Sequence, residues 1–271
     1  MLATAVIVFR EVLEAALIVS LVLAATTGIK GRNFWIVCGF IGGVIGAGIV
    51  ATFAGAISDL ASGMGQEVFN AGVMFLAVFM LTWHCVWMSR HGRELAATAS
   101  AVGKDVLEGR KPLGALAVVV GVAVLREGSE VVLFLYGIAV GGENQAGQMA
   151  IGGVLGLLGG VALGAAMYFG LLQIPTRRLF MVTNLLIILL ASAMASQGVG
   201  YLVNADILPS WGHAIWDTSW LLSEKSIVGK MLHSLVGYTA RPEGIQLVAY
   251  TATAAAIILL MRQFGQRSSQ S

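Results

Sequence analysis

Charged residues are scarce in this sequence. Asp, Glu, Lys and Arg together make up 11% of the 271 residues, hydrophobic residues make up 58%, and the mean hydropathy is +0.87. Soluble domains carry about 25% charged residues, so the composition excludes an ordinary soluble protein. A formal net charge of only +2 gives no indication of a nucleic-acid partner, and we expect none.

The sequence contains very little cysteine and lacks the motifs of intramembrane metalloenzymes. Only Cys38 and Cys85 occur, each inside an apolar run, which argues against a disulfide framework and a CxxC redox pair. The chain has no HExxH motif, no Glu-x-x-His pair of the di-iron type and no bis-histidine arrangement within its apolar runs. We therefore expect a protein that is not an enzyme and holds no permanent cofactor.

What the chain does contain is a series of long apolar runs. About 20 residues cross the ~30 Å hydrocarbon core as a helix, and helices are favoured because lipid offers no partners to backbone polar groups. We expect an all-α, polytopic membrane protein with seven transmembrane helices in the lipid bilayer of the cytoplasmic (inner or plasma) membrane. The first run lacks the basic segment and cleavage site of a signal peptide, so we expect it to be retained. The runs lie near residues 2–25, 34–57, 68–89, 113–139, 147–171, 179–203 and 245–263.

The distribution of Lys and Arg predicts the orientation. If the connections alternate between the two sides, one side receives eleven basic residues and the other receives three. The positive-inside rule then places the N-terminus outside and the C-terminus in the cytoplasm. The three are Lys225, Lys230 and Arg241, and the eleven are Lys30, Arg32, Arg90, Arg93, Lys104, Arg110, Lys111, Arg177, Arg178, Arg262 and Arg267.

Two of the runs repeat a charged motif, "REVLE" from Arg10 and "REGSE" from Arg126, 116 residues later. A second match, "IGGVIG" at 41–46 and "IGGVLG" at 151–156, follows at an offset of 110. The first three spans therefore look duplicated as the next three. Because three is an odd number, the second copy must be inverted, as in many secondary transporters.

This 3+3 inverted-topology repeat predicts the organisation of the whole chain. We expect a first three-helix repeat at 1–89, a cytoplasmic linker at 90–112 and a second three-helix repeat at 113–203. An extracytoplasmic loop at 204–244 contains an amphipathic, tryptophan-rich segment that suits an interfacial helix. A seventh span and a short cytoplasmic tail follow at 245–271.

Both charged motifs fall near the bilayer centre, where they predict a metal site. Within each motif the Arg and both Glu share one helix face, and a charge at this depth costs about 2.5–3.5 kcal/mol unless it faces a cavity or a partner. Four carboxylates and two guanidinium groups leave a formal charge of −2, which suits a hard divalent cation or a trivalent one. The alternative is two structural salt bridges, which explains two identical triads at matched depth poorly. We expect Glu11, Glu14, Glu127 and Glu130 to bind the metal and Arg10 and Arg126 to support them.

The doubled motif resembles that of the oxidase-dependent iron transporter family, the bacterial and fungal high-affinity iron permeases. "LTWHCVWMSRHGREL" at 81–95 and the segment from Trp216 to Tyr250 agree with the family as well. The resemblance implies seven spans and inward transport of iron, coordinated by the motif glutamates. Some members carry a large extracytoplasmic domain before the first span. We expect no such domain here, so the resemblance implies a separate extracytoplasmic iron oxidase or iron-delivery protein.

Other polar residues have weaker interpretations. Glu67 and Asp217 are candidates for the ion entrance, although a solvated loop residue and a helix cap are the simpler explanations. His84 is expected to pack or to hydrogen-bond, with transient iron handling at His91 as a minor alternative.

The sequence thus predicts an iron permease, with iron as transported substrate. Two alternatives stay open. One is a transporter of another hard divalent cation such as manganese, which the charge count does not separate from iron. The other is an intramembrane metal-binding redox protein.

Overall fold

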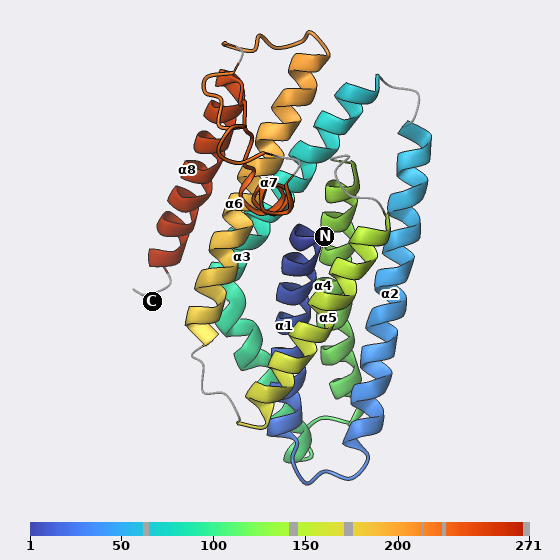
Figure 1. Cartoon of the computed structure of the whole chain (residues 1–271). Coiled ribbons are helices and arrows are strands. Elements are labelled where there is room, and N and C mark those ends of the chain that lie inside the picture. Colours follow the sequence, from blue (N-terminus) through green and yellow to red (C-terminus); the bar gives the residue numbers. More distant parts are fainter. Residues whose placement is uncertain (62–64, 141–145, 171–175, 213, 224–225, 268–271) are drawn as a thin grey trace.

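The computed structural model in Figure 1 describes residues 1–61, 65–140, 146–170, 176–212, 214–223 and 226–267. Within these ranges it describes the backbone alone at 54–61, 66, 88–93, 95–96, 140, 176–180, 227, 230–231, 234–235 and 264–267. This part of the chain contains eight α-helices and no strand. The helices are α1 (Leu2–Ala25), α2 (Arg32–Ala61), α3 (Gln66–Leu107), α4 (Gly114–Val140), α5 (Ala146–Tyr168), α6 (Thr176–Asn204), α7 (Ile227–Val236) and α8 (Gly244–Arg267).

Each of the seven apolar runs coincides with one long helix, so the all-α prediction is confirmed for the described residues. Five of these helices, α2, α3, α5, α6 and α8, are long and apolar enough to cross a membrane. The other two, α1 and α4, have similar length, and each carries the three charges of its motif. The predicted interfacial helix corresponds to α7, where the Ser226 hydroxyl accepts a hydrogen bond from Gly229 N and caps the first turn.

Two helix ends differ from the predicted runs. Helix α3 continues to Leu107 and therefore includes most of the predicted linker at 90–112. Alanine favours helix, and the buried residues Ala99 and Val106 of this extension pack into the core. Helix α5 stops at Tyr168, where the following Gly170 adopts a positive φ of 70° and ends the helix in the usual way for glycine. Residues 171–175 and the tail at 268–271 lie outside the described residues.

The long helices form a bundle in which α1, α3 and α4 lie between α2 at one edge and α8 at the other (Figure 1). Helix α1 packs against α4 and α5, and α4 packs against α1, α2 and α3. Helices α1 and α4 run in opposite directions (Figure 1). The charged motifs therefore lie on two neighbouring antiparallel helices.

Glycine rows make two of these contacts unusually close. In α5, Gly152, Gly156, Gly160 and Gly164 recur at every fourth position and are buried. A methyl group at Gly156 would lie 2.5 Å from the Ala5 carbonyl oxygen of α1. On the other side, a methyl group at Gly43 of α2 would lie 2.8 Å from the Gly121 carbonyl oxygen of α4. Small residues of this kind let helix backbones approach each other in lipid.

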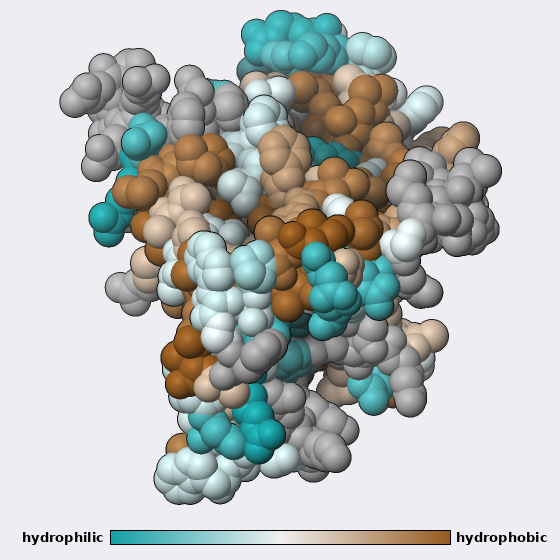
Figure 2. Space-filling view, turned by 90° about the horizontal axis from the view of Figure 1, so that it is seen from above, coloured by the Kyte–Doolittle hydropathy of each residue, from teal (hydrophilic) through white to brown (hydrophobic). Residues whose placement is uncertain are grey.

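The core consists of two apolar clusters with the charged motifs between them. Ile7 of α1 and Phe134 of α4 belong to the first cluster, and Val22 of α1 and Val124 of α4 belong to the second. Along each helix, the charged motif lies between these residues. Large apolar side chains also cover the outside of α2 and α5, as expected for surfaces that face lipid. The upper end of the bundle instead exposes hydrophilic residues among hydrophobic ones (Figure 2).

Candidate metal centre

The first motif is fully buried and internally paired. The relative exposure of Arg10 is 1%, and Glu11 and Glu14 are buried beside it on α1. The guanidinium of Arg10 lies 2.8 Å from Glu11 Oε1 through Nη1 and 2.8 Å from Glu14 Oε1 through Nη2. Asn184 Oδ1 of α6 lies 3.5 Å from the same Nη2. One arginine thus holds both carboxylates of its helix.

The second motif has the same ion pairs but is more open. On α4, Arg126 Nε lies 3.1 Å from Glu130 Oε1 and 3.9 Å from Glu127 Oε1. The side chain of Arg126 is 27% exposed and that of Glu130 is 17% exposed, whereas Glu127 is buried. The guanidinium carbon of Arg126 lies 3.9 Å from the ring centre of Trp87 on α3, a cation–π contact.

Packing of α1 against α4 brings carboxylates from both motifs together. One oxygen each from Glu11, Glu127 and Glu130 lie within 4.8 Å of one another. Two of these residues, Glu11 and Glu127, each have a buried Oε2 atom without a hydrogen-bond partner. Buried acceptors of this kind are costly unless a donor or cation satisfies them. The arrangement therefore suits a cation, with oxygen ligands supplied from two helices.

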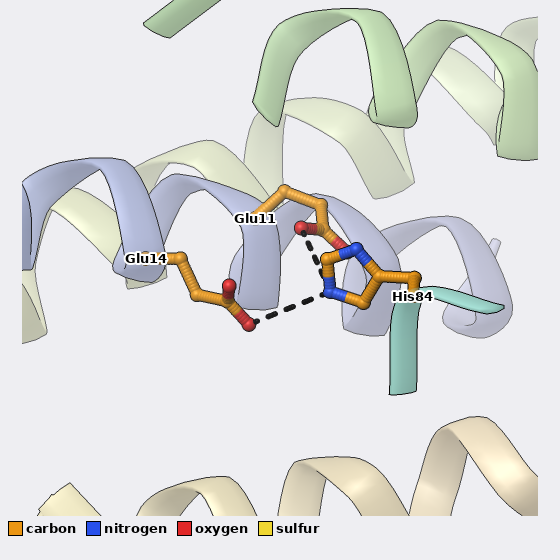
Figure 3. Close-up of side chains that lie close together, drawn as sticks. All are labelled: Glu11, Glu14 and His84. Carbon is orange, nitrogen blue, oxygen red and sulfur yellow. Dashed lines mark ion pairs between the residues drawn. The ribbon is translucent and has the colours of Figure 1, made fainter. Parts of the chain in front are cut away.

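His84 packs and pairs as the sequence suggested, and its partners are the carboxylates of this cluster. It lies on α3, is 3% exposed, and its Nε2 is 4.0 Å from Glu11 Oε2 and 3.9 Å from Glu14 Oε1. Figure 3 shows one ring nitrogen of His84 facing the carboxylates of both Glu11 and Glu14. Its Nδ1 contacts Glu130 Oε2. The sequence showed a histidine in the middle of an apolar run, which could have marked it as a candidate site residue. The sequence did not indicate which residues the imidazole would face.

A cavity of about 290 Å³ reaches the cluster between α3 and α4. Its polar lining residues are His84 and Glu130. Met80 lies one turn from His84 on α3, and Phe134 lies one turn from Glu130 on α4; both line the cavity as well. On the opposite side of the cluster, about one turn from Glu130 and His84, Arg126 stacks on Trp87 in the same interface. The complete lining is Phe79, Met80, Trp83, His84, Glu130 and Phe134.

The two candidate entrance residues are not part of the cluster. Glu67 is exposed in the first turn of α3. Asp217 lies in the segment before α7 and already has partners, because Oδ1 accepts a hydrogen bond from Ser219 N at 2.9 Å and Oδ2 lies 2.9 Å from Arg241 Nη2. These contacts with Ser219 and Arg241 lower the pKa of Asp217 to about 2. The side chain of His91 lies outside the described residues.

Comparison with known proteins identifies the family. Residues 1–266 match the iron permease FTR1 family. The chain belongs to this family. A ferrous iron permease EfeU of Escherichia coli O6:H1 is 29% identical over 272 residues, covering 98% of both chains. That of Yersinia pestis is 28% identical over 248 residues, covering 90% of this chain and 87% of its own, and that of Shigella sonnei is 30% identical over 240 residues, covering 87% and 86%.

Membership of the iron permease family confirms the resemblance that the doubled motif indicated. The family and these relatives are permeases, that is, transporters rather than enzymes. Together with five helices apolar enough to cross a membrane, this identifies a multi-pass membrane protein. No solved structure matches the chain.

Proposed function

We propose that this protein imports iron across the cytoplasmic membrane through the cluster formed by Glu11, Glu14, Glu127 and Glu130. The observation that carries the proposal is the convergence of carboxylates from α1 and α4 at a buried site with unpaired oxygens. The relatives are named ferrous iron permeases, and we take ferrous iron as the substrate. Iron is then cargo and not a resident cofactor.

The proposed topology has seven spans, α1 to α6 and α8, with the N-terminus outside and the C-terminus in the cytoplasm. Helices α1 to α3 and α4 to α6 form the two inverted repeats. The packing supports this assignment, because α1 packs on α5 as α4 packs on α2, and α1 and α4 run in opposite directions. An inverted repeat places its site near the membrane midplane, which is where both motifs lie in their helices.

In this proposal the arginines keep the empty site intact. Carboxylates that share a site repel one another, and a neighbouring cation relieves that repulsion. Arg10 contacts both Glu11 and Glu14, and Arg126 contacts Glu130 at 3.1 Å. An incoming iron ion competes with the guanidinium groups for the same oxygens. Binding then releases part of the arginine contacts, and departure of the ion restores them.

The access route that we propose follows the interface of α3 and α4. In the proposed orientation, the cavity beside Met80 and Phe134 would lie on the extracytoplasmic side of the cluster and the stack of Arg126 on Trp87 on the cytoplasmic side. We therefore propose that the site is approached from outside and closed toward the cytoplasm. We propose that a separate extracytoplasmic protein supplies the iron, as the family resemblance implies: a delivery protein fits a ferrous substrate, whereas an iron oxidase would supply ferric iron.

Uptake of radioactive iron into proteoliposomes tests the proposal. We expect wild-type protein to take up ferrous iron and the Glu14→Gln, Glu130→Gln double variant to lose at least about 90% of the rate, because two carboxylates of the site become neutral. Glu108→Gln is the matched control, since Glu108 pairs with Arg110 at an exposed position. Ferric iron is supplied separately to identify the transported oxidation state. Equal uptake by a folded double variant would show that the triads are structural.

A further inference from the structure

His84 belongs to neither charged motif, yet it lies between them. Its ring is buried on α3, and it contacts carboxylates of both α1 and α4. The ring also meets Phe134 edge-on, with centroids 6.2 Å apart and an angle of 89° between the planes. An aromatic neighbour in this geometry limits rotation of the imidazole. The residue is thus held in a fixed orientation at the centre of the cluster.

The two nitrogens of His84 have different surroundings. Nδ1 contacts Glu130 Oε2, whereas Nε2 faces Glu11 Oε2 at 4.0 Å and Glu14 Oε1 at 3.9 Å (Figure 3). A histidine that binds a metal through one nitrogen usually donates a hydrogen bond from the other to a carboxylate or carbonyl. A proton on Nδ1 would be directed at Glu130 and would leave the lone pair of Nε2 facing the glutamates of α1.

We propose that His84 is an iron ligand and determines the preference of the site for ferrous iron over harder cations. Nε2 binds the ion together with Glu11 and Glu14, and Glu130 orients the imidazole. The potential ligand atoms of these three residues lie within 4.8 Å of one another. Glu11 also belongs to the group with Glu127 and Glu130, which offers oxygen alone. This inference rests on the proposed function, since it names a further ligand of the same site.

The chemistry of the donor atoms explains the preference. Carboxylates suit magnesium, calcium and manganese, whereas imidazole suits iron, nickel, copper and zinc. At a given site, affinity also increases from manganese to ferrous iron. A site of four carboxylates alone would distinguish these ions poorly, as the charge count from the sequence indicated. One nitrogen ligand at Nε2 supplies the missing discrimination.

Competition binding to purified protein under anaerobic conditions measures this preference. We expect His84→Gln to reduce the affinity for ferrous iron by about tenfold or more, the range seen when groups around a metal are altered, with a smaller change for manganese. His233→Gln is the matched control, because His233 lies on α7 and contacts the Tyr238 carbonyl oxygen. Equal losses for both ions, or no loss, would overturn the assignment of His84.

X-ray absorption of the protein loaded with one equivalent of ferrous iron provides a test that needs no variant. We expect outer-shell scattering from one imidazole ring in wild type and in His233→Gln, and its absence in His84→Gln. A wild-type spectrum with oxygen ligands alone would overturn the proposal even if His84→Gln failed to fold.

The variant Glu14→Gln distinguishes failure of the proposed iron site from failure of the His84 assignment. If Glu14→Gln binds iron as wild type does, the proposed carboxylate site is wrong. If Glu14→Gln loses iron binding but the wild-type spectrum shows oxygen ligands alone, only the assignment of His84 is rejected.

Discussion

Arg10 and Arg126 hold corresponding positions in the two motifs but have different surroundings. Arg10 is buried and contacts two carboxylates at 2.8 Å, whereas Arg126 is 27% exposed and stacks on Trp87. Removing one partner of a buried ion pair costs about 3–5 kcal/mol, because the remaining charge is left uncompensated. Partial exposure reduces that cost. The two arginines should therefore contribute unequally to stability.

We expect Arg10→Gln to lower the melting temperature in detergent much more than Arg126→Gln. Ferrous iron should restore part of the lost stability of Arg10→Gln, since a ligand that binds only the folded state stabilises it. Melting curves with and without iron measure both effects. Equal losses for the two variants, or no effect of iron, would contradict the proposed role of Arg10 in holding the empty site.

At the scale of residues, the sequence located the motifs but not all of their neighbours. Periodicity was enough to place Arg10, Glu11 and Glu14 on one face of a helix, because those relations are local. His84 lies 70 residues after Glu14 in the chain, and its contact depends on how α3 packs against α1. The same applies to the contact of Asp217 with Arg241, which lies beyond α7. Whether the four glutamates bind iron stays a prediction.

Among the elements, α5 and α1 form a contact that depends on the absence of side chains. A methyl group at Gly156 would lie 2.5 Å from the Ala5 carbonyl oxygen, whereas at Gly153 nothing lies within 4 Å. Overpacking costs typically about 1–3 kcal/mol, and alanine in an open helical position is favourable by up to about 1 kcal/mol over glycine. We expect Gly156→Ala to lower the melting temperature and Gly153→Ala to leave it unchanged or raise it. The reverse order would contradict the close packing of α1 on α5.

The interface of α3 and α4 gives a prediction about access. In a variant with Cys38→Ser and Cys85→Ala, a cysteine in place of Met80 should react with a small water-soluble thiol reagent added from outside. Ferrous iron should slow the reaction, because it binds next to the cavity that Met80 lines. The matched control is Leu116→Cys, on α4 in the buried second apolar cluster. Absence of reaction at position 80, or no protection by iron, would reject the proposed route.

Element bounds followed largely from the apolar runs, and the exceptions have physical causes. Residues 2–25 form α1 as predicted, because a run without proline or loop residues leaves the backbone only helical partners in lipid. Helix α3 extends beyond its apolar run because helix formation there depends on alanine content and packing, not on continuous apolarity. Hydropathy alone does not contain that information.

At the scale of the whole molecule, a charged cluster lies between two apolar clusters in a bundle of long helices. Charges near the centre of a membrane are tolerated when they pair or line an ion pathway. The ion pairs of the two arginines meet the first condition, and in our proposal the unpaired carboxylate oxygens meet the second. Seven spans and the inverted repeat were predicted from parity and from the doubled motif, and they remain proposals that the packing supports.

The location of bound iron tests this account most directly. Crystals soaked anaerobically with ferrous iron would show it by anomalous scattering at the iron absorption edge. We expect one main peak within coordination distance of Glu11 and Glu14, between α1 and α4. A main peak elsewhere, for example beside Glu67 or Asp217, or the same peak in the Glu14→Gln, Glu130→Gln variant, would contradict the claim that the paired motifs form the iron site.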